Sequence, residues 1–146
     1  MFSLTRASFV GSGFVLLALL DLGLRFLWLE RSHFTCNSGA LWGLPFPSGV
    51  ILIGTIAILG YLFFLWNRTK DLVMRTLLLM ILLGGSVNLV DRFAYGCVLD
   101  YLSWPGILES IFPRFNVGDS LILLGILCLI GCSSFRVAGS KIPANS

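Results

Sequence analysis

The sequence predicts an all-α membrane protein, a single integral membrane domain over residues 1–146 with four transmembrane helices. Two observations lead to this prediction. Hydrophobic residues make up 57% of the chain and charged residues only 12%, whereas soluble domains are about 25% charged. In addition, four apolar stretches are each long enough to cross about 30 Å of hydrocarbon, which takes about 20 helical residues. A soluble fold of this size could not bury so much apolar surface, so the bilayer is the expected solvent.

The predicted transmembrane helices cover residues 8–29, 49–66, 72–90 and 117–135. The first apolar run follows Arg6 and continues to about Leu29 without an A-x-A-like cleavage site, so we expect an uncleaved helix and not a signal peptide. Residues 67–71 form a short polar connection that makes the second and third helices antiparallel neighbours. The longer connections, about 30–48 and 91–116, join the remaining helices.

The basic residues predict the orientation of the helices. Six of the ten Lys and Arg lie near the termini or around the short connection, which places them on one side: Arg6, Arg68, Lys70, Arg75, Arg136 and Lys141. The positive-inside bias therefore predicts that both termini are cytoplasmic and that the two long connections lie outside. Those connections hold or border six of the seven acidic residues. The sequence has no basic run of the kind that binds nucleic acid, so we expect no nucleic-acid partner.

The cysteine and histidine content argues against a metal site. The chain has four cysteines without a C-x-x-C motif and a single histidine, so a zinc site is not expected. Cys128 and Cys132 lie one helical turn apart in an apolar run. We interpret them as buried packing residues and not as a redox pair, because free cysteine often behaves as a small buried hydrophobe.

Charged residues inside the first predicted helix suggest either structure or function. Asp21 and Arg25 are four residues apart, so they lie on one helical face and can pair. Each would be costly alone in hydrocarbon, by about 2.5–3.5 kcal/mol, so such residues normally face protein or water. Both a functional site and an ion pair that joins the first helix to its neighbours fit this pattern.

A second polar group closes the third predicted helix. Asn88 and Asp91 are three residues apart and share a face, and Arg92 can reach a carboxylate with two hydrogen bonds. The motif fits a capping or packing network at a helix end as well as it fits a catalytic centre.

Two further aspartates stand on separate predicted elements that both end at the outer membrane surface. Asp100 lies among Val, Leu and Tyr in a predicted short extended segment, where desolvation should raise its pKa. Asp119 lies in the first turn of the fourth helix, after Asn116 as the N-cap, and by itself this reads as a capping box. Two adjacent carboxylates cannot both ionise, so such a pair can activate water with one member and polarise a carbonyl with the other. A membrane aspartic hydrolase is therefore one possibility.

Five motifs in order along the chain make it resemble the bacterial lipoprotein signal peptidases, also called signal peptidase II. The family patterns are an Asp with a basic residue four positions later, N-T-G-A-A-F-G, G-N-x-x-D-R, V-V-D-F and F-N-x-A-D-S. The matching segments here are Asp21 with Arg25, Asn37–Gly43, Val87–Arg92, Val98–Tyr101 and Phe115–Ser120. The sequence departs from the family at Leu22, Leu24, Arg25, Trp42, Val87 and Gly118.

The resemblance implies an aspartic endopeptidase of the bacterial inner membrane, with Asp100 and Asp119 as its catalytic pair at the outer face. Its substrate would be a prolipoprotein, cut immediately before a cysteine that bears a diacylglyceryl group, and membrane lipids would surround it. Residues that would support the pair or bind the substrate are Asn37, Gly39, Asn88, Asp91, Arg92, Asn116, Asp21 and Arg25. The resemblance also implies an outer β-cradle over roughly residues 31–47 and a short outer helix near 105–112. We expect a monomer without cofactor or metal.

Two alternatives compete with the peptidase. The departures from the family motifs are compatible with a non-catalytic four-helix scaffold or assembly factor of the same fold. Asp21 and Arg25 within a helix also suggest a small transporter, but the chain lacks the internal repeats and broken helices that such proteins show. Replacing Asp100 or Asp119 by Asn separates the first alternative from the peptidase.

Overall fold

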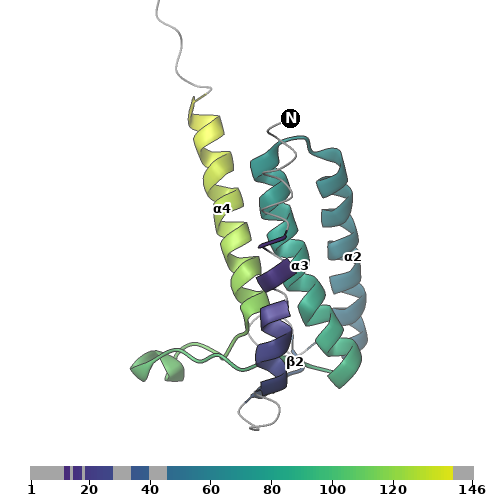
Figure 1. Ribbon diagram of the computed structural model, residues 1–146, viewed down its shortest axis with the longest axis vertical. Coiled ribbons are helices and arrows are strands. Elements are labelled where there is room, and N and C mark those ends of the chain that lie inside the picture. Colours follow the sequence, from purple (N-terminus) through teal and green to yellow (C-terminus); the bar gives the residue numbers. More distant parts are fainter. Residues whose placement is uncertain (1–11, 14, 18, 28–33, 40–45, 140–146) are drawn as a thin grey trace, which may run out of the picture.

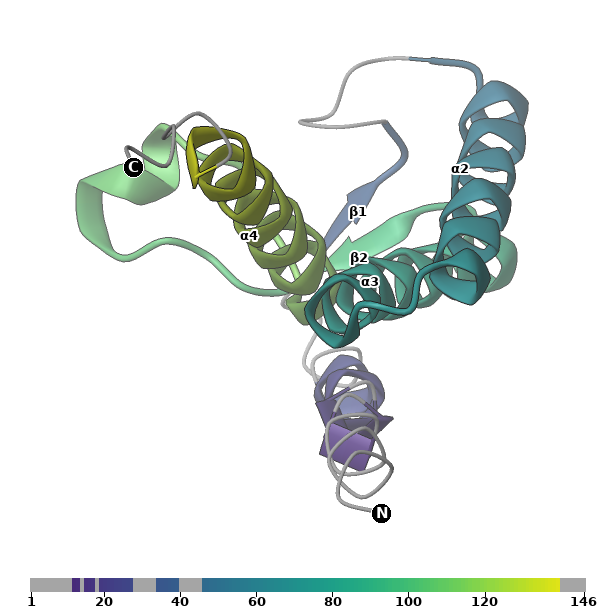
Figure 2. The ribbon, with the colours of Figure 1, turned by 90° about the horizontal axis from the view of Figure 1, so that it is seen from above.

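The computed structural model describes residues 12–13, 15–17, 19–27, 34–39 and 46–139. Its longest elements are three helices, α2 (Ser48–Arg68), α3 (Leu72–Tyr95) and α4 (Val117–Gly139). Residues 19–27 are also helical. Seen from above, α3 lies at the centre, with α2, α4 and the helical N-terminal segment around it (Figures 1 and 2). The prediction of a mostly helical protein is thus confirmed.

Two of the described helices, α2 and α3, are long and apolar enough to cross a membrane. In α4 the apolar portion that meets the same criterion of composition is shorter, Val117–Cys132. The first predicted helix is described only in part, because residues 8–11 and 28–29 lie outside the described residues. Four transmembrane helices therefore stay a prediction.

The hairpin of α2 and α3 agrees with the short polar connection predicted between them. Asp71 caps α3, since its side chain accepts a hydrogen bond from the backbone N–H of Met74 at 2.8 Å. At the other end, α3 continues to Tyr95, beyond the predicted end at residue 90, so residues 91–95 are helical and not part of a loop. The helix ends where Gly96 adopts a left-handed conformation with φ of 74°, which residues with a Cβ disfavour.

Glycines allow α3 and α4 to pack closely beside the functional residues. A Cβ at Gly84 would lie 2.4 Å from the carbonyl oxygen of Gly118, and one at Gly125 would lie 2.6 Å from Ile81. Small residues permit such close approach of helices in membrane proteins, where packing rather than hydrophobic burial drives association. This contact brings the N-terminal turn of α4 against the middle of α3.

A two-stranded antiparallel sheet covers the end of the bundle opposite the α2–α3 connection (Figures 1 and 2). Strand β1 (Thr35–Asn37) pairs with β2 (Val98–Asp100), with Thr35 opposite Asp100. The extended segment predicted around Asp100 is confirmed, and β1 falls inside the predicted cradle. Most of that cradle, residues 31–33 and 40–45, lies outside the described residues. The predicted short outer helix is a 3₁₀ helix, Gly106–Ser110.

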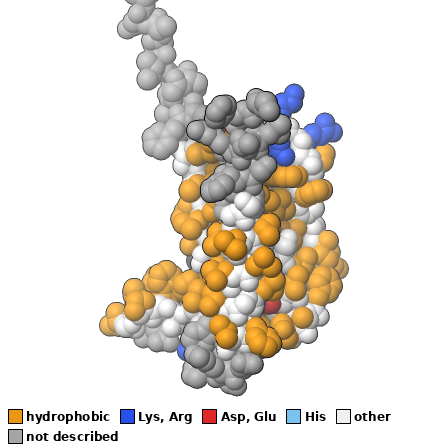
Figure 3. Space-filling view, in the orientation of Figure 1, with side chains coloured by type: hydrophobic (Ala, Val, Ile, Leu, Met, Phe, Trp, Pro, Cys, Tyr) orange, Lys and Arg blue, Asp and Glu red, His pale blue; other side chains and the backbone are white. Residues whose placement is uncertain are grey.

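Apolar side chains cover the outside of the bundle. Figure 3 shows a broad hydrophobic surface around its middle, with Lys and Arg gathered at the end where α2 meets α3. Arg68 and Arg75 lie over the rings of Phe64 and Trp66 at this end, at 5.2 and 4.7 Å. Such a belt is expected where lipid is the solvent.

The prediction that Cys128 and Cys132 are buried is wrong. Cys128 is exposed and Cys132 half-buried, and both are free thiols. The face of α4 that packs on α3 carries Gly125 instead. Cys128 therefore belongs to the outer apolar face of α4, whereas Cys132, seven residues after Gly125, lies nearer the inner face. Composition alone could not distinguish the two faces.

Candidate functional site

Asp119 is held by the capping box at the start of α4. The backbone N–H of Asp119 donates to Asn116 Oδ1 at 2.9 Å, and the backbone N–H of Asn116 donates to Asp119 Oδ2 at 3.1 Å. This reciprocal arrangement confirms the predicted cap and satisfies two N–H groups that a helix start leaves without partners. The other carboxylate oxygen, Oδ1, accepts from Asn88 Nδ2 of α3 at 2.7 Å.

Asp100, at the end of β2, is buried and also accepts hydrogen bonds from two asparagines. Asn37 Nδ2 of β1 donates to its Oδ2 and Asn116 Nδ2 donates to its Oδ1, each at 3.0 Å. Asn116 has no exposed surface. It binds Asp100 through its amide nitrogen and Asp119 through its amide oxygen and backbone, so it joins the two aspartates directly.

Electrostatics at this pair favour a shared proton. The pKa of Asp100 is raised from 3.8 to about 6, chiefly by burial and also by the charge of Asp119, while hydrogen bonds from Asn37 and Asn116 and the charge of Arg25 oppose the rise. The predicted desolvation of Asp100 is thus confirmed. In the described part of the chain, the groups that donate to either carboxylate are asparagine amides and one backbone N–H. These donors are neutral, so they do not offset two negative charges.

Asp21, Arg25 and Asp91 form a second buried cluster, separate from the pair. Arg25 Nε donates to Asp21 Oδ2 at 2.5 Å and Arg25 Nη1 donates to Asp91 Oδ2. The predicted pairing of Asp21 with Arg25 is confirmed, and Asp91 is their partner from α3. Asp21 and Arg25 therefore form an ion pair that joins the N-terminal helical segment to α3, as one of the two interpretations of this motif predicted.

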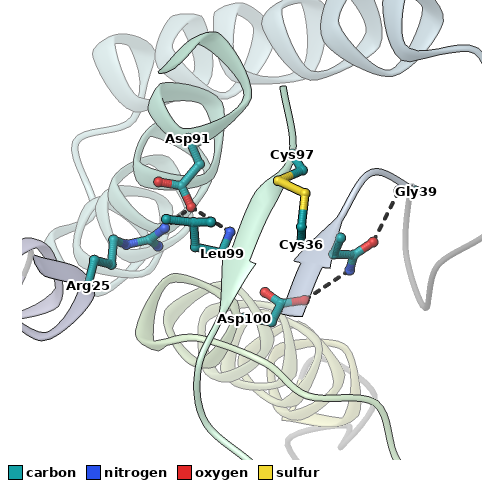
Figure 4. The surroundings of a disulfide bond; sticks show 8 residues. Arg25, Cys36, Gly39, Asp91, Cys97, Leu99 and Asp100 are labelled. Atoms are coloured by element: carbon teal, nitrogen blue, oxygen red, sulfur yellow. Dashed lines mark hydrogen bonds and ion pairs between the residues drawn. A yellow bond between two sulfur atoms is a disulfide. The ribbon is translucent and has the colours of Figure 1, made fainter. Parts of the chain in front are cut away.

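This cluster also anchors the strand that carries Asp100. The backbone N–H of Leu99 donates to Asp91 Oδ2 at 2.8 Å (Figure 4). The Tyr101 hydroxyl donates to Asp21 Oδ1 at 2.5 Å. Burial and the neighbouring Asp21 raise the pKa of Tyr101, which keeps its hydroxyl a donor. Both chain neighbours of Asp100 are therefore held by the cluster, a role for Tyr101 that the sequence analysis missed.

Among the described residues, Arg92 makes no hydrogen bond to a carboxylate, which corrects the prediction of a bidentate contact. Its Nη2 donates to the carbonyl oxygen of Gly39 at 3.0 Å, and its Nη1 lies 3.4 Å from that of Asn88. The backbone N–H of Gly39 in turn donates to Asn37 Oδ1 at 3.1 Å. Arg92 and Gly39 thus hold the end of β1. The turn after Asn37 lies beside Arg92 of α3, so the guanidinium contacts this turn and not a carboxylate.

A disulfide between Cys36 and Cys97 joins β1 to the start of β2 (Figure 4). The two Cα atoms are 5.5 Å apart, within the usual range for such bonds. The sequence analysis did not find this pairing. Its signal was available, because the two cysteines lie in the two long connections that were both predicted outside the cytoplasm, where disulfides persist.

No group of three His, Cys, Asp or Glu side chains within the described ranges is arranged to hold a metal ion. The absence of cofactor and metal stays a prediction for the chain as a whole. What the residues do provide is a carboxylate pair, with Asp100 buried and Asp119 half-buried, and a set of fixed amide donors. This arrangement is suited to acid–base chemistry on a polar substrate.

Comparisons with known proteins agree with this geometry. The family model described as signal peptidase (SPase) II matches residues 13–135. A lipoprotein signal peptidase of Halothermothrix orenii is 33% identical over 64% of this chain and 63% of the relative. Another, of Chlamydia trachomatis serovar D, is 37% identical over 72% of this chain and 65% of the relative. These matches span less than two thirds of the relatives' own length.

Solved structures share the fold. One, described as a bacterial membrane enzyme determined by the in meso method at 2.3 Å resolution, matches 99% of this chain and 96% of its own, with a TM-score of 0.77 and 22% identity. A second of the same description, at 1.9 Å, has a TM-score of 0.72 and the same identity. At this identity the likeness concerns the fold alone.

Proposed function

This chain belongs to the signal peptidase II family, and we propose on that basis that it is a membrane aspartic endopeptidase that removes signal peptides from prolipoproteins. The cut would fall immediately before a cysteine that bears a diacylglyceryl group. Asp100 and Asp119 would be the catalytic pair, with Asn37, Asn88 and Asn116 as their hydrogen-bonding partners.

One observation carries the proposal: two carboxylates from distant parts of the chain meet on a single buried residue, Asn116. Neither carboxylate has a cationic hydrogen-bond donor within the described residues. Because two unpaired negative charges repel strongly in a buried site, the pair retains one proton. A singly protonated carboxyl pair is the chemical state that peptide hydrolysis by aspartates requires.

In the proposed reaction, the ionised carboxylate accepts a proton from a water molecule, whose oxygen attacks the scissile carbonyl carbon. The protonated carboxyl donates a hydrogen bond and then its proton to the carbonyl oxygen, which gives a neutral tetrahedral intermediate. The C–N bond then breaks as the leaving nitrogen takes a proton from one carboxyl and a hydroxyl group of the intermediate returns a proton to the other. The products are a carboxylic acid and an amine, and the pair again holds one proton. The pair titrates as a unit, so neither role is assigned to one residue.

The substrate class requires the pair to lie where lipid meets solvent. We propose a single integral domain with four transmembrane helices in the bacterial inner membrane, both termini cytoplasmic and the sheet outside. The apolar belt and the basic end opposite the sheet (Figure 3) support this orientation. The Cys36–Cys97 disulfide supports it independently, because disulfides are rare in the reducing cytosol.

The test is to replace Asp100 or Asp119 by Asn and measure conversion of a lipidated precursor in membranes. Each variant should lose at least about a thousandfold in rate, since groups that act as a unit fail together. Asp71→Asn is the matched control, because Asn also caps helices and Asp71 lies at the opposite end of α3.

Full activity in either dyad variant would contradict the peptidase and favour the non-catalytic scaffold. The scaffold was suggested by residues that differ from the family motifs. Those that the structure describes do not contact the carboxylates of Asp100 or Asp119. Leu22 is 47% exposed on the apolar surface. Gly118 provides the space in which Asn116 and Asn88 approach α4, since a Cβ there would lie 2.9 Å from Asn116 Oδ1. Trp42 lies outside the described residues.

A further inference from the structure

We propose that the Cys36–Cys97 disulfide is a positioning element of the aspartate pair: it holds Asn37 on Asp100, so that the proposed peptidase is fully active only when this bond is oxidised. This inference rests on the proposed function for its activity readout. The two cysteines lie outside the five motifs by which the chain resembles its family.

The first step is that β1 makes few contacts other than the disulfide that could hold it in place. Its pairing with β2 covers three residues on each strand, Thr35–Asn37 and Val98–Asp100. Two-stranded sheets are marginal in water without further support. Beyond the sheet, the described contacts of this segment are the Asn37 bond to Asp100 and the Arg92 bond to Gly39.

The second step is the difference between the two ends of the disulfide. Cys97 is 3% exposed and stands next to Val98 and Leu99, which are equally buried, and the cluster around Arg25 anchors Leu99. Cys36 is exposed on β1, directly before Asn37. The bond therefore joins a firmly packed strand to a weakly held one, at the residue next to the one that binds Asp100 (Figure 4).

The third step is the consequence for Asp100. The Asn37 hydrogen bond favours the ionised carboxylate and so opposes the rise of its pKa. Without the disulfide, β1 separates more readily and the hydrogen bond is made for less of the time, so the balance of burial and hydrogen bonding that sets the pKa of Asp100 changes. The disulfide thus acts on the reaction through Asn37 without touching the substrate.

The exposure of Cys36 makes the bond accessible to a dithiol reductant. Attack by one thiolate of the dithiol on the Cys36 sulfur breaks the S–S bond, and the second thiol of the reductant then releases the mixed disulfide. Two electrons and two protons pass to the protein, which gains two thiols, and the dithiol becomes a disulfide.

The experiment compares wild-type enzyme, purified and folded, before and after reduction with dithiothreitol, with free thiols counted. Reduction should lower kcat for a lipidated precursor by roughly 10- to 100-fold, the range for losing a hydrogen bond to a charged group, and reoxidation should restore it. The inflection of the rate profile that reports Asp100 should move to a different pH. Unchanged rate and pH profile with both additional thiols exposed would overturn the proposal.

Variants separate positioning from general loss of structure. Cys36→Ser with Cys97→Ser should reproduce the reduced enzyme, whereas Cys128→Ser with Cys132→Ser, the matched pair in α4, should behave as wild type. Adding Asn37→Ala to the first pair should cause no further loss, because both changes remove the same hydrogen bond. Losses that multiply would show that the disulfide acts elsewhere and would overturn the proposal.

A readout without catalysis keeps the two proposals distinct. Infrared titration follows the protonated carboxyl band of Asp100, identified as the band absent from Asp100→Asn. Its midpoint should shift on reduction whether or not the enzyme cleaves the precursor, and an unmoved midpoint would overturn the inference. Failure of oxidised wild type to cleave would count against the proposed function alone.

Discussion

The protein holds two pairs of aspartates in different ways, the first fully buried and the second with Asp100 buried and Asp119 half-buried. Asp21 and Asp91 share the guanidinium of Arg25, so a cation offsets their charges. Asp100 and Asp119 share Asn116, a neutral residue that donates hydrogen bonds but carries no charge. Both pairs join elements distant in sequence, and they adjoin each other through β2.

The difference shows how a fold separates support from chemistry. A carboxylate pair around an arginine can remain ionised, and it binds backbone and hydroxyl donors that fix the adjacent strand. A pair around amides has no cationic hydrogen-bond donor among the described residues, and the charges of Arg25 and Arg92 act on it without a hydrogen bond, so it favours keeping one proton. The first pair is therefore suited to positioning and the second to proton transfer. The predictions below test this division, from the largest expected effect to the smallest.

Removing the cation should damage folding most. Arg25→Met leaves Asp21 and Asp91 buried without a positive partner, which should lower the free energy of unfolding by about 3–5 kcal/mol. Thermal unfolding in detergent measures this. Arg25→Lys retains the charge and should lose less, and an unchanged melting temperature in Arg25→Met would show that the cluster does not support the fold.

Removing the shared amide should act on the reaction. Asn116→Ala deletes the side-chain bonds to Asp100 and to the Asp119 backbone, so precursor cleavage should fall by about 100-fold or more, with a helix-cap loss of about 1 kcal/mol in stability. Asn67→Ala is the control, since its exposed amide binds only the Phe63 carbonyl at the far end of α2. Equal rates in the two variants would contradict a role for Asn116 in the pair.

The contact between α3 and α4 should set the geometry of the second pair. Gly84→Ala places a Cβ 2.4 Å from the Gly118 carbonyl, so the helices must shift, which should lower stability by about 1–3 kcal/mol and reduce activity. Gly54→Ala on α2 has open space around its Cβ and should be neutral or slightly stabilising. Equal melting temperatures in Gly84→Ala and Gly54→Ala would contradict the close contact between α3 and α4.

The smallest effect concerns titration. The charge of Asp119 raises the pKa of Asp100, which stands at about 6. In Asp119→Asn this repulsion disappears, so the pKa of Asp100 should fall and the residue should lose its proton at lower pH. Infrared titration of its carboxyl band measures the shift. A rise instead would mean that the two carboxylates do not share one proton.

Local features of the sequence were sufficient for much of this description. The apolar runs predicted α2 and α3, the Asn116–Asp119 spacing predicted the cap of α4, and the spacing of Asp21 and Arg25 predicted their ion pair. These succeed because helix periodicity, capping and pairing one turn apart depend on residues close in the chain. Resemblance to a family, and not periodicity, singled out Asp100 among the loop residues.

Other features depended on contacts between distant segments. The Arg92 contact was predicted wrongly, and exposed Cys128 was predicted to be buried. Both depend on which helices and strands pack against each other, and that depends on contacts between distant segments. The Cys36–Cys97 bond and the Tyr101 contact to Asp21 went unnoticed for the same reason. Each requires the register of β1 on β2, or the position of a helix that is separated from its partner by most of the chain.

By itself, the sequence determined that the protein is helical and apolar, where two of its long helices begin, and which carboxylates carry motifs. Only the tertiary structure decided that Asp21 and Asp91 meet a cation while Asp100 and Asp119 meet an amide. The physical reason is that the proton affinity of a buried acid depends on the charges and donors within a few ångströms, and here those come from elements far apart in the chain.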